Sequence, residues 1–249
     1  MSEHLAILAS YPKTGSTWLR KIIAEIVSPG ESADAVVPSF FKRFPDVKEY
    51  EVQGRKLGFV KTHLYPQHPN FGMLRGQISS IVTIYRHPMD VLLSSLNYAK
   101  VKDARSCFIG NIPKSVEQII ADGEIQHYID DFLNHDGLNW YSAQSGPFSL
   151  YQRRWRSMAE RFPYFEICYE DMVAAPHKTL ADLVKFMFRE RRDEEVEHIL
   201  LQAEARTKQD GQFYWRRQAF GYRALLTQSL CEDIDKRFRS VLDELGYGG

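Results

Sequence analysis

The segment YPKTGSTW at residues 11–18 has the residue types that bind a phosphate group. It joins a short apolar run to a segment of helical spacing, so the N–H groups of a helix start would surround whatever occupies the turn. Gly15 permits close approach of the backbone, Lys13 adds a full charge, and the hydroxyls of Ser16 and Thr17 add donors. Taken alone, the same residues also fit an ordinary loop before a capped helix.

This loop departs from the pattern of the nucleoside triphosphatases. That pattern has two glycines with four residues between them, followed by Lys and then Ser or Thr. Here Lys13 precedes the single glycine, Gly15. The departure argues against a phosphotransferase, although it leaves phosphate binding intact.

Apolar runs and helical spacing alternate along the chain and predict the elements that position this loop. Buried strands are expected at residues 5–10, 57–60, 80–85 and 165–169. Helices are expected from Ser16, from Pro88, and at residues 115–123, 145–161, 176–189, 193–205 and 228–245. The polar stretch 28–56 is expected to be an irregular lid or insertion. The alternation predicts an α/β fold with three layers, α/β/α, around a central parallel sheet of about four to five strands.

Length and composition favour a single domain, residues 1–249, in a cytoplasmic enzyme. The 32 basic residues equal the 32 acidic residues, so no net positive charge favours nucleic acid as a partner. The first apolar run is too short for a membrane span or a signal peptide, so no membrane association is expected. The three cysteines, Cys107, Cys168 and Cys231, are widely spaced and are expected to be reduced.

The order of motifs along the chain resembles that of the PAPS-dependent sulfotransferases, where PAPS is 3′-phosphoadenosine-5′-phosphosulfate. YPKTGSTWL is similar to their 5′-phosphosulfate loop, which makes Lys13, Thr14, Gly15, Ser16 and Thr17 donor-binding residues. RHPMDVLLS, residues 86–94, is similar to their 3′-phosphate motif, in which Arg86 and Ser94 hold that phosphate. The resemblance implies a P-loop nucleotide-kinase-like fold, PAPS as donor, and no metal ion.

Two further elements extend the resemblance. YEDM, residues 169–172, is similar to a turn in which Tyr169 contacts the adenine, and Trp18 is implied to stack on the same base, although Trp18 also fits a core position. Lys61-Thr62-His63 resembles the element whose histidine is the general base. Imidazole titrates near neutrality, so His63 suits proton removal, and Lys13 and Lys61 suit stabilisation of the transferring group. A lone histidine after a strand is otherwise an ordinary polar residue.

The resemblance weakens near the C-terminus, where the family carries a glycine-rich loop over the nucleotide. This chain has YWRRQAFGYR at residues 214–223, which makes Arg216 and Arg217 candidate phosphate ligands. Gln218 stands where the family has glycine, and the basic run also fits a solvated surface. The family's short dimerisation motif is missing, so the oligomeric state stays open.

The expected reaction moves a sulfuryl group from PAPS to a hydroxyl or amine of a small acceptor, by in-line attack with His63 as general base. Aromatic side chains predict an aromatic or apolar acceptor: Phe40, Phe41, Phe44, Tyr65, Phe71, Tyr98, Trp140, Tyr141 and Phe148. Two alternatives are a phosphotransferase on the same architecture and a non-catalytic nucleotide-binding protein.

Overall fold

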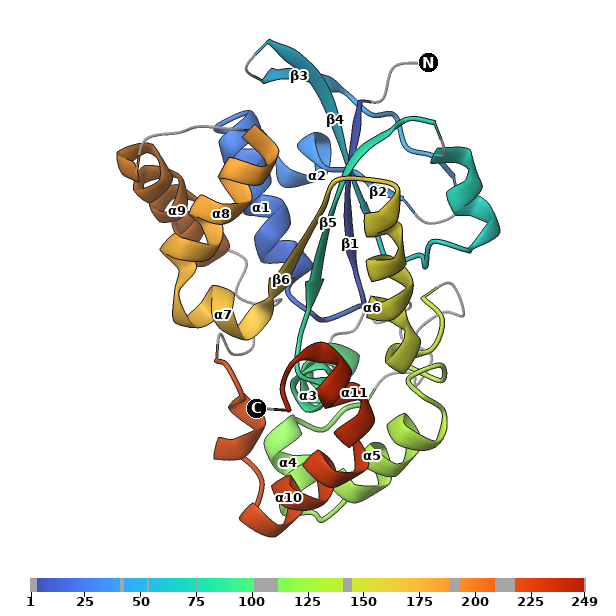
Figure 1. Cartoon of the computed structure of the whole chain (residues 1–249). Helices are drawn as coiled ribbons and strands as arrows, with labels where there is room; N and C mark the ends of the chain where they lie inside the picture. The colour runs from blue at the N-terminus through green and yellow to red at the C-terminus, as the bar shows by residue number, and fades with distance from the viewer. Residues whose placement is uncertain are drawn as a thin grey trace.

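The computed structural model describes residues 4–40, 43–52, 54–74, 76–100, 112–140, 145–188, 193–208 and 218–248. Within these residues a six-stranded sheet forms the centre of the molecule (Figure 1). Five strands are parallel in the order β2-β4-β1-β5-β6, and β3 pairs antiparallel with β4. The strands are β1 (Leu5–Ser10), β2 (Ser39–Phe40), β3 (Glu49–Val52), β4 (Arg55–Thr62), β5 (Ile78–Tyr85) and β6 (Tyr164–Cys168). The predicted parallel α/β fold is confirmed.

The central strand β1 shows why an apolar run forms the middle of such a sheet. All six of its residues are buried, because neighbouring strands flank it and helices cover both faces. Leu5, Ile7 and Ala9 pack into one hydrophobic cluster, whereas Ala6 and Leu8 pack into a second. Successive side chains point to opposite faces, so this short run supplies both halves of the core.

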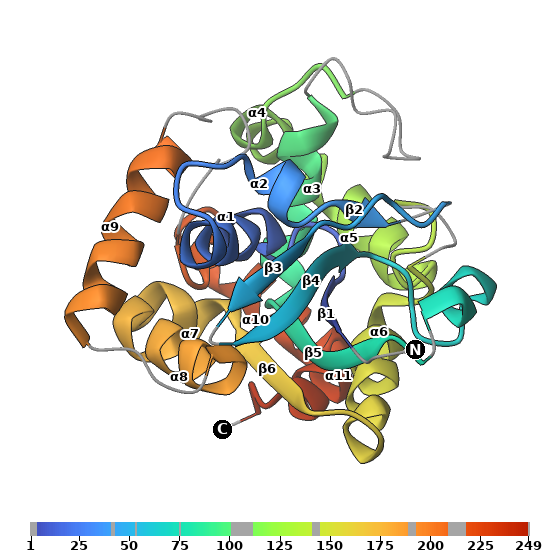
Figure 2. The same cartoon turned by 90° about the horizontal axis from the view of Figure 1, so that it is seen from above.

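Helices form a layer on each side of the sheet and a further group beyond its carboxyl edge, as Figures 1 and 2 show. On one side lie α1 (Ser16–Val27), α2 (Ala33–Val36), α7 (Tyr169–Ala174), α8 (Pro176–Phe188) and α9 (Asp193–Lys208). On the other lies α6 (Phe148–Arg156). Near the carboxyl edge lie α3 (Pro88–Ala99), α4 (Val116–Ala121), α5 (Ile125–Asn134), α10 (Gln228–Arg237) and α11 (Arg239–Leu245). Short 3-10 helices are η1 (Pro69–Leu74), η2 (Ser157–Glu160) and η3 (Gly221–Ala224).

The expectation of an irregular segment at residues 28–56 was wrong for its described part. It contains the helix α2 and two strands, β2 and β3. In β3 exposed and buried residues alternate, and it forms a hairpin with β4. The signal was present as Tyr50 and Val52 between Glu49 and Glu51, but four residues gave too short a pattern. The helix α5 was also missed, and Tyr169 begins α7 rather than ending a strand.

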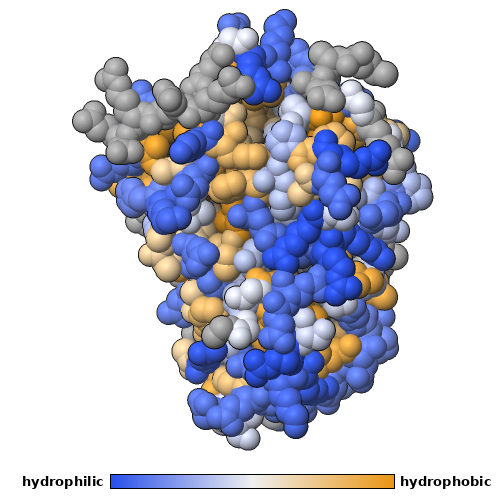
Figure 3. All heavy atoms as spheres, in the orientation of Figure 1, coloured by the Kyte–Doolittle hydropathy of each residue, from blue (hydrophilic) through white to orange (hydrophobic). Residues whose placement is uncertain are grey.

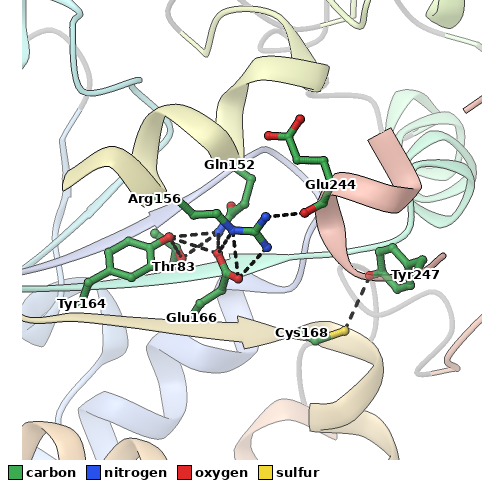
Figure 4. A network of polar contacts seen from close by, with 8 residues as sticks. All are labelled: Thr83, Gln152, Arg156, Tyr164, Glu166, Cys168, Glu244 and Tyr247. Atoms are coloured by element: carbon green, nitrogen blue, oxygen red, sulfur yellow. Dashed lines mark hydrogen bonds and ion pairs between the residues drawn. The ribbon is translucent and has the colours of Figure 1, made fainter. Parts of the chain in front are cut away.

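A polar network fastens α6 and the C-terminal helix to the sheet (Figure 4). Gln152 donates to Thr83 at 2.9 Å and to Glu166 at 2.5 Å, and Arg156 forms an ion pair with Glu166 at 2.7 Å. A guanidinium N–H of Arg156 also donates to the backbone oxygen of Glu244 in α11. The carboxyl end of the sheet is therefore held against the C-terminal segment.

Hydrophilic side chains cover much of the face shown in Figure 3, with apolar atoms visible between them. In the described part of the chain, four large apolar side chains are exposed, and they are spread along the sequence: Phe44, Met73, Leu138 and Leu201. No described helix has the length and hydropathy needed to span a membrane. Cys168 and Cys231 are free thiols, whereas Cys107 lies outside the described residues.

Candidate active site

The carboxyl ends of β1, β4 and β5 lie side by side and bring the sequence motifs together. Ala9 is level with Thr62 on one neighbour and with Thr83 on the other. The residues that follow these positions are the phosphate loop, His63 and Arg86. The phosphate loop, His63 and Arg86 therefore meet at the carboxyl edge of the sheet.

The phosphate loop turns sharply between β1 and α1. Lys13 has φ 68° and Gly15 has φ 106°, both in the left-handed region. The hydroxyl of Thr14 donates to the backbone oxygen of Tyr11 at 2.8 Å and closes the turn. The N–H groups of Ser16 and Thr17 lie in the first turn of α1, where a helix has no internal acceptor for them. The loop therefore aims backbone donors and a helix N-terminus at one point, which suits a phosphate.

Gly15 is required by its neighbour as well as by its backbone angle. A Cβ atom at this position would lie 2.5 Å from Cδ2 and 2.8 Å from Cε2 of the Tyr169 ring. The guanidinium carbon of Arg86 lies 4.1 Å from the centroid of the same ring. Tyr169 thus joins the phosphate loop to Arg86, and both Tyr169 and Arg86 are buried. Its predicted contact with adenine stays a prediction.

Arg86 has a buried hydrogen-bond donor that its described neighbours leave unsatisfied. Its Nη2 atom lies 3.9 Å from a carboxylate oxygen of Asp90 and 3.5 Å from the backbone oxygen of Gln218. Its Nε atom is buried and has no hydrogen-bond partner among the described residues. A buried donor without an acceptor is costly, so a phosphate oxygen at this place would satisfy it. Together with the glycine turn at Gly15, this atom fits the donor nucleotide that the motifs predict.

The second phosphate motif continues along α3. Ser94 is half-buried on this helix, six positions after Pro88. Asp90, which sequence reasoning did not single out, accepts from the N–H groups of Gly221 at 3.2 Å and Tyr222 at 3.0 Å. It fixes the segment that follows Gln218 beside Arg86. Arg216 and Arg217 lie outside the described residues, so their role as phosphate ligands stays a prediction.

His63 is oriented by a bond to the end of β1. Its Nδ1 atom lies 2.6 Å from the backbone oxygen of Ser10, which makes Nδ1 the protonated nitrogen of the neutral ring. The neutral ring then carries its basic lone pair on Nε2. Burial lowers the pKa of His63 well below its ordinary value of 6.5, and the charge of Lys61 lowers it further, against the opposing effect of the Ser10 carbonyl. The histidine is therefore held in the form that accepts a proton.

Lys61 and Lys13 surround this histidine with positive charge. Burial lowers the pKa of Lys61 to about 8, and the charges of Arg20 and Lys13 act in the same direction. The ammonium of Lys13 lies 4.3 Å from the ring centroid of Tyr98 on α3. The positive charges of Lys13 and Lys61 form a local field suited to an anionic group.

Trp18 belongs to the core of the described structure. It is 5% exposed and lies in the cluster beneath α7, α8 and α9, where it lines a small apolar cavity with Leu180, Leu183 and Leu200. The core interpretation of Trp18 is confirmed, while base stacking stays a prediction.

Glu170 proved more important than the sequence suggested. Its Oε1 atom accepts from the N–H of His87 at 3.0 Å, and its Oε2 atom accepts from the hydroxyl of Tyr247 at 2.6 Å. No side-chain hydrogen bond caps the start of α7, so Glu170 does not act as a helix cap. Figure 4 shows Tyr247 beside Cys168 at the start of the same turn.

Some of the aromatic residues predicted to bind the acceptor lie in the core, whereas others are less buried. Phe71 and Trp140 are fully buried and Phe148 nearly so, all in the core cluster. Tyr65 lies 4.7 Å from the guanidinium of Arg154, measured to its ring centroid. Phe40 packs against Phe44, with ring centroids 5.9 Å apart. Phe41 and Tyr141 lie outside the described residues.

Comparison with curated proteins identifies distant relatives over most of the chain. Human sulfotransferase 6B1 is 23% identical over 260 residues, covering 97% of this chain and 77% of the relative. Rabbit (Oryctolagus cuniculus) amine sulfotransferase is 20% identical over 200 residues, covering 78% of this chain and 59% of the relative. The matches thus span about three fifths to three quarters of these relatives' lengths.

Solved structures share the fold at low sequence identity. Mouse sulfotransferase SULT7A1 complexed with PAP (3′-phosphoadenosine-5′-phosphate) matches with a TM-score of 0.68 and 17% identity. The match covers 99% of this chain and 86% of the other. Retinol dehydratase complexed with androsterone and PAP matches with a TM-score of 0.66 and 13% identity, covering 97% and 81%. The family model described as the sulfotransferase domain matches residues 4–246. The chain therefore belongs to the family of PAPS-dependent sulfotransferases.

Proposed function

We propose that this protein transfers the sulfuryl group of PAPS to a hydroxyl or amine of a small acceptor, with His63 as general base. The observation that carries the proposal is the bond from His63 Nδ1 to the oxygen of Ser10, at 2.6 Å. It sets the neutral tautomer whose Nε2 atom accepts a proton, and the charges of Lys61 and Lys13 both act on this ring. General-base assistance of this kind contributes roughly 10²–10⁴-fold to a rate.

Each residue of the site has a distinct task in this reaction. Bound PAPS supplies the sulfuryl group, and the bisphosphate PAP is the product that leaves. His63 takes the proton of the acceptor on Nε2 as the acceptor atom attacks in line. Lys13 and Lys61 stabilise the negative charge on the transferring group and on the departing phosphate. Arg86 and Ser94 bind the 3′-phosphate, with Arg216 and Arg217 as further ligands, and Tyr169 and Trp18 bind the base.

The acceptor is proposed to be small and aromatic or apolar. Tyr65, Tyr98 and Phe44 are candidate acceptor residues that are not fully buried, and Tyr98 contacts the ammonium of Lys13. Among similar structures, retinol dehydratase was solved with androsterone and with retinol. Both neighbours' ligands are apolar, which supports the same class here.

The remaining expectations form part of the proposal. Residues 1–249 act as one domain in the cytoplasm, without a metal ion, a nucleic acid or a membrane as partner. No group of three or more His, Cys, Asp or Glu side chains suited to a metal occurs in the part of the chain that the structure describes. Turnover is expected to be unchanged in EDTA, and a loss that added magnesium restores would reject metal independence.

Calorimetric titration with PAP and, in parallel, with ADP tests the donor assignment. Micromolar binding of PAP with weak binding of ADP is expected without added magnesium, because only PAP carries a 3′-phosphate for Arg86. Equal or tighter binding of ADP would overturn the proposal in favour of a phosphotransferase.

His63→Ala tests the chemistry separately. Formation of PAP from PAPS, measured with a panel of phenols, alcohols and amines, is expected to fall roughly 10²–10⁴-fold while PAP binding is retained. Unchanged turnover would reject His63 as the base, and no turnover of the unaltered protein with any acceptor would favour a non-catalytic nucleotide-binding protein.

A further inference from the structure

Arg20 connects the donor-loop helix to a segment that sequence analysis expected to be irregular. It lies on α1, one turn after Ser16, and its side chain is 11% exposed. Its Nε atom donates to the backbone oxygen of Val37 at 2.5 Å, and its Nη1 atom pairs with the carboxylate of Asp34. Asp34 lies in α2 and Val37 directly follows it, and α2 lies beside α1 in Figures 1 and 2.

The segment that Arg20 holds, residues 32–40, is bonded in turn to the end of β4. The backbone oxygen of Pro38 accepts from the N–H of Lys61 at 2.9 Å. The oxygen of Phe40 accepts from the hydroxyl of Thr62 at 3.0 Å, and that hydroxyl accepts from the N–H of Leu64 at 3.0 Å. A continuous set of bonds therefore runs from Arg20 to the strand end on which Lys61 and His63 stand.

Arg20 also interacts electrostatically with Lys61 and His63. The groups that act on Lys61 are Arg20 and Lys13, which lower its pKa, and Asp34, which raises it. Those acting on His63 are Lys61, Lys13 and Arg20, opposed by the Ser10 carbonyl. Arg20 is thus close enough to affect both residues electrostatically. An apolar side chain would satisfy packing at this position, but it would leave the Val37 oxygen without this donor.

We propose that Arg20 is a positioning residue of the sulfuryl-transfer site, which holds residues 32–40 against the end of β4 and so sets the place of Lys61 and His63 opposite the donor loop. This inference rests on the proposed function. A guanidinium suits the task because its planar fork bonds a carbonyl and a carboxylate at once, which an ammonium does less well.

Arg20→Gln tests the inference, with Lys21→Gln as the matched control. Lys21 is the neighbouring cation on the same helix, so both variants lose one positive charge. Hydrogen exchange of the Lys61 amide and the titration of its labelled ¹³Cε carbon are followed by NMR. In Arg20→Gln we expect at least tenfold faster exchange and a Lys61 midpoint shifted to higher pH, because a positive neighbour is gone. Lys21→Gln is expected to match the unaltered protein in both.

Arg20→Lys keeps the charge without the fork. It is expected to restore the Lys61 midpoint but only part of the amide protection, which separates charge from positioning. If Arg20→Gln remains folded with unaltered exchange and midpoint, the positioning role is overturned. If Arg20→Gln does not fold, Asp34→Asn replaces it, with faster Lys61 exchange and a lower midpoint expected and unchanged values overturning the role.

Calorimetry with PAP on the unaltered protein distinguishes the two proposals. Absence of PAP binding would overturn the sulfotransferase function, and the NMR results would then describe a positioning contact in some other site. PAP binding together with unaltered NMR behaviour in Arg20→Gln would overturn the role of Arg20 alone.

Discussion

The Nδ1 atom of His63 lies 2.6 Å from the backbone oxygen of Ser10, so this contact joins the ends of the neighbouring strands β4 and β1. The general base proposed for the reaction is thus oriented by the strand that leads into the phosphate loop. The oxygen of Ser10 belongs to the main chain, so no side-chain substitution at that position removes this acceptor.

The first prediction concerns the alkaline limb of the pH profile. His63 acts unprotonated, and its lowered pKa keeps it unprotonated at neutral pH. A rise in pH therefore leaves the protonation of His63 unchanged and does not lower turnover through this residue. Lys61 acts protonated and has a pKa of about 8, so turnover is expected to fall as the pH rises through this value. Lys61→Arg is expected to remove the fall, because arginine keeps its charge. The measurement is kcat/KM for PAPS, which reports the groups of the free protein, between pH 6 and about 10 with a non-ionising alcohol acceptor.

Lys56→Arg is the control, since Lys56 is exposed on the same strand and is expected to leave the profile unchanged. An alkaline fall that persists in Lys61→Arg would show that another group causes it.

The second prediction concerns the close contact between Gly15 and Tyr169. Gly15→Ala is expected to weaken PAP binding at least tenfold and to destabilise the fold, because the new methyl group would meet the ring at 2.5 Å. Gly54→Ala is a matched control. Gly54 also has a positive φ, of 73°, but nothing lies within 4 Å of a Cβ there, so only the backbone strain of about 1–2 kcal/mol applies.

Calorimetry with PAP and urea unfolding of both variants compare the two effects. Equal losses of stability, with PAP binding retained in Gly15→Ala, would mean that the contact with Tyr169 has no bearing on the donor site.

The third prediction concerns Arg86 and the distinction between PAP and ADP. Arg86→Lys keeps the charge but lacks an Nε donor, which is the buried atom that has no partner in the described residues. A hydrogen bond to a charged group contributes about 1.5–3 kcal/mol, so PAP affinity is expected to fall roughly 10- to 150-fold. ADP affinity is expected to change little. Parallel calorimetric titrations measure both, and an equal loss for the two nucleotides would place Arg86 away from the 3′-phosphate.

The fourth prediction concerns Glu170, which supports the turn that carries Arg86. Glu170→Gln leaves a single acceptor oxygen where the carboxylate now serves both the His87 N–H and the Tyr247 hydroxyl. Loss of one buried partner is expected to lower the free energy of unfolding by about 1–3 kcal/mol and to weaken PAP binding. Asp171→Asn, the exposed neighbouring carboxylate, is expected to match the unaltered protein. Similar behaviour of the two variants in urea unfolding would remove the special role of Glu170.

Some elements could be predicted because their signals are local. The β1 run Leu5–Ser10 is apolar throughout, and α1 begins at Ser16 after a glycine turn, so both were found close to their observed bounds. The strands β2 and β3 were missed because two and four residues form no readable period and depend on β4 for their bonds. Trp18 fitted two interpretations, and its burial is decided by helices α8 and α9, more than 150 positions further along the chain.

The sequence by itself determined the family, the parallel α/β fold and the residues most suited to the chemistry, because motifs of phosphate loops and strand ends are short and local. The tertiary structure decided how those motifs are held. The supports are Ser10 for His63, Asp90 and Glu170 for the Arg86 turn, and Arg20 for the end of β4. Each joins segments distant in sequence, and such contacts exist only once the sheet has brought the strand ends together, so no local pattern announces them.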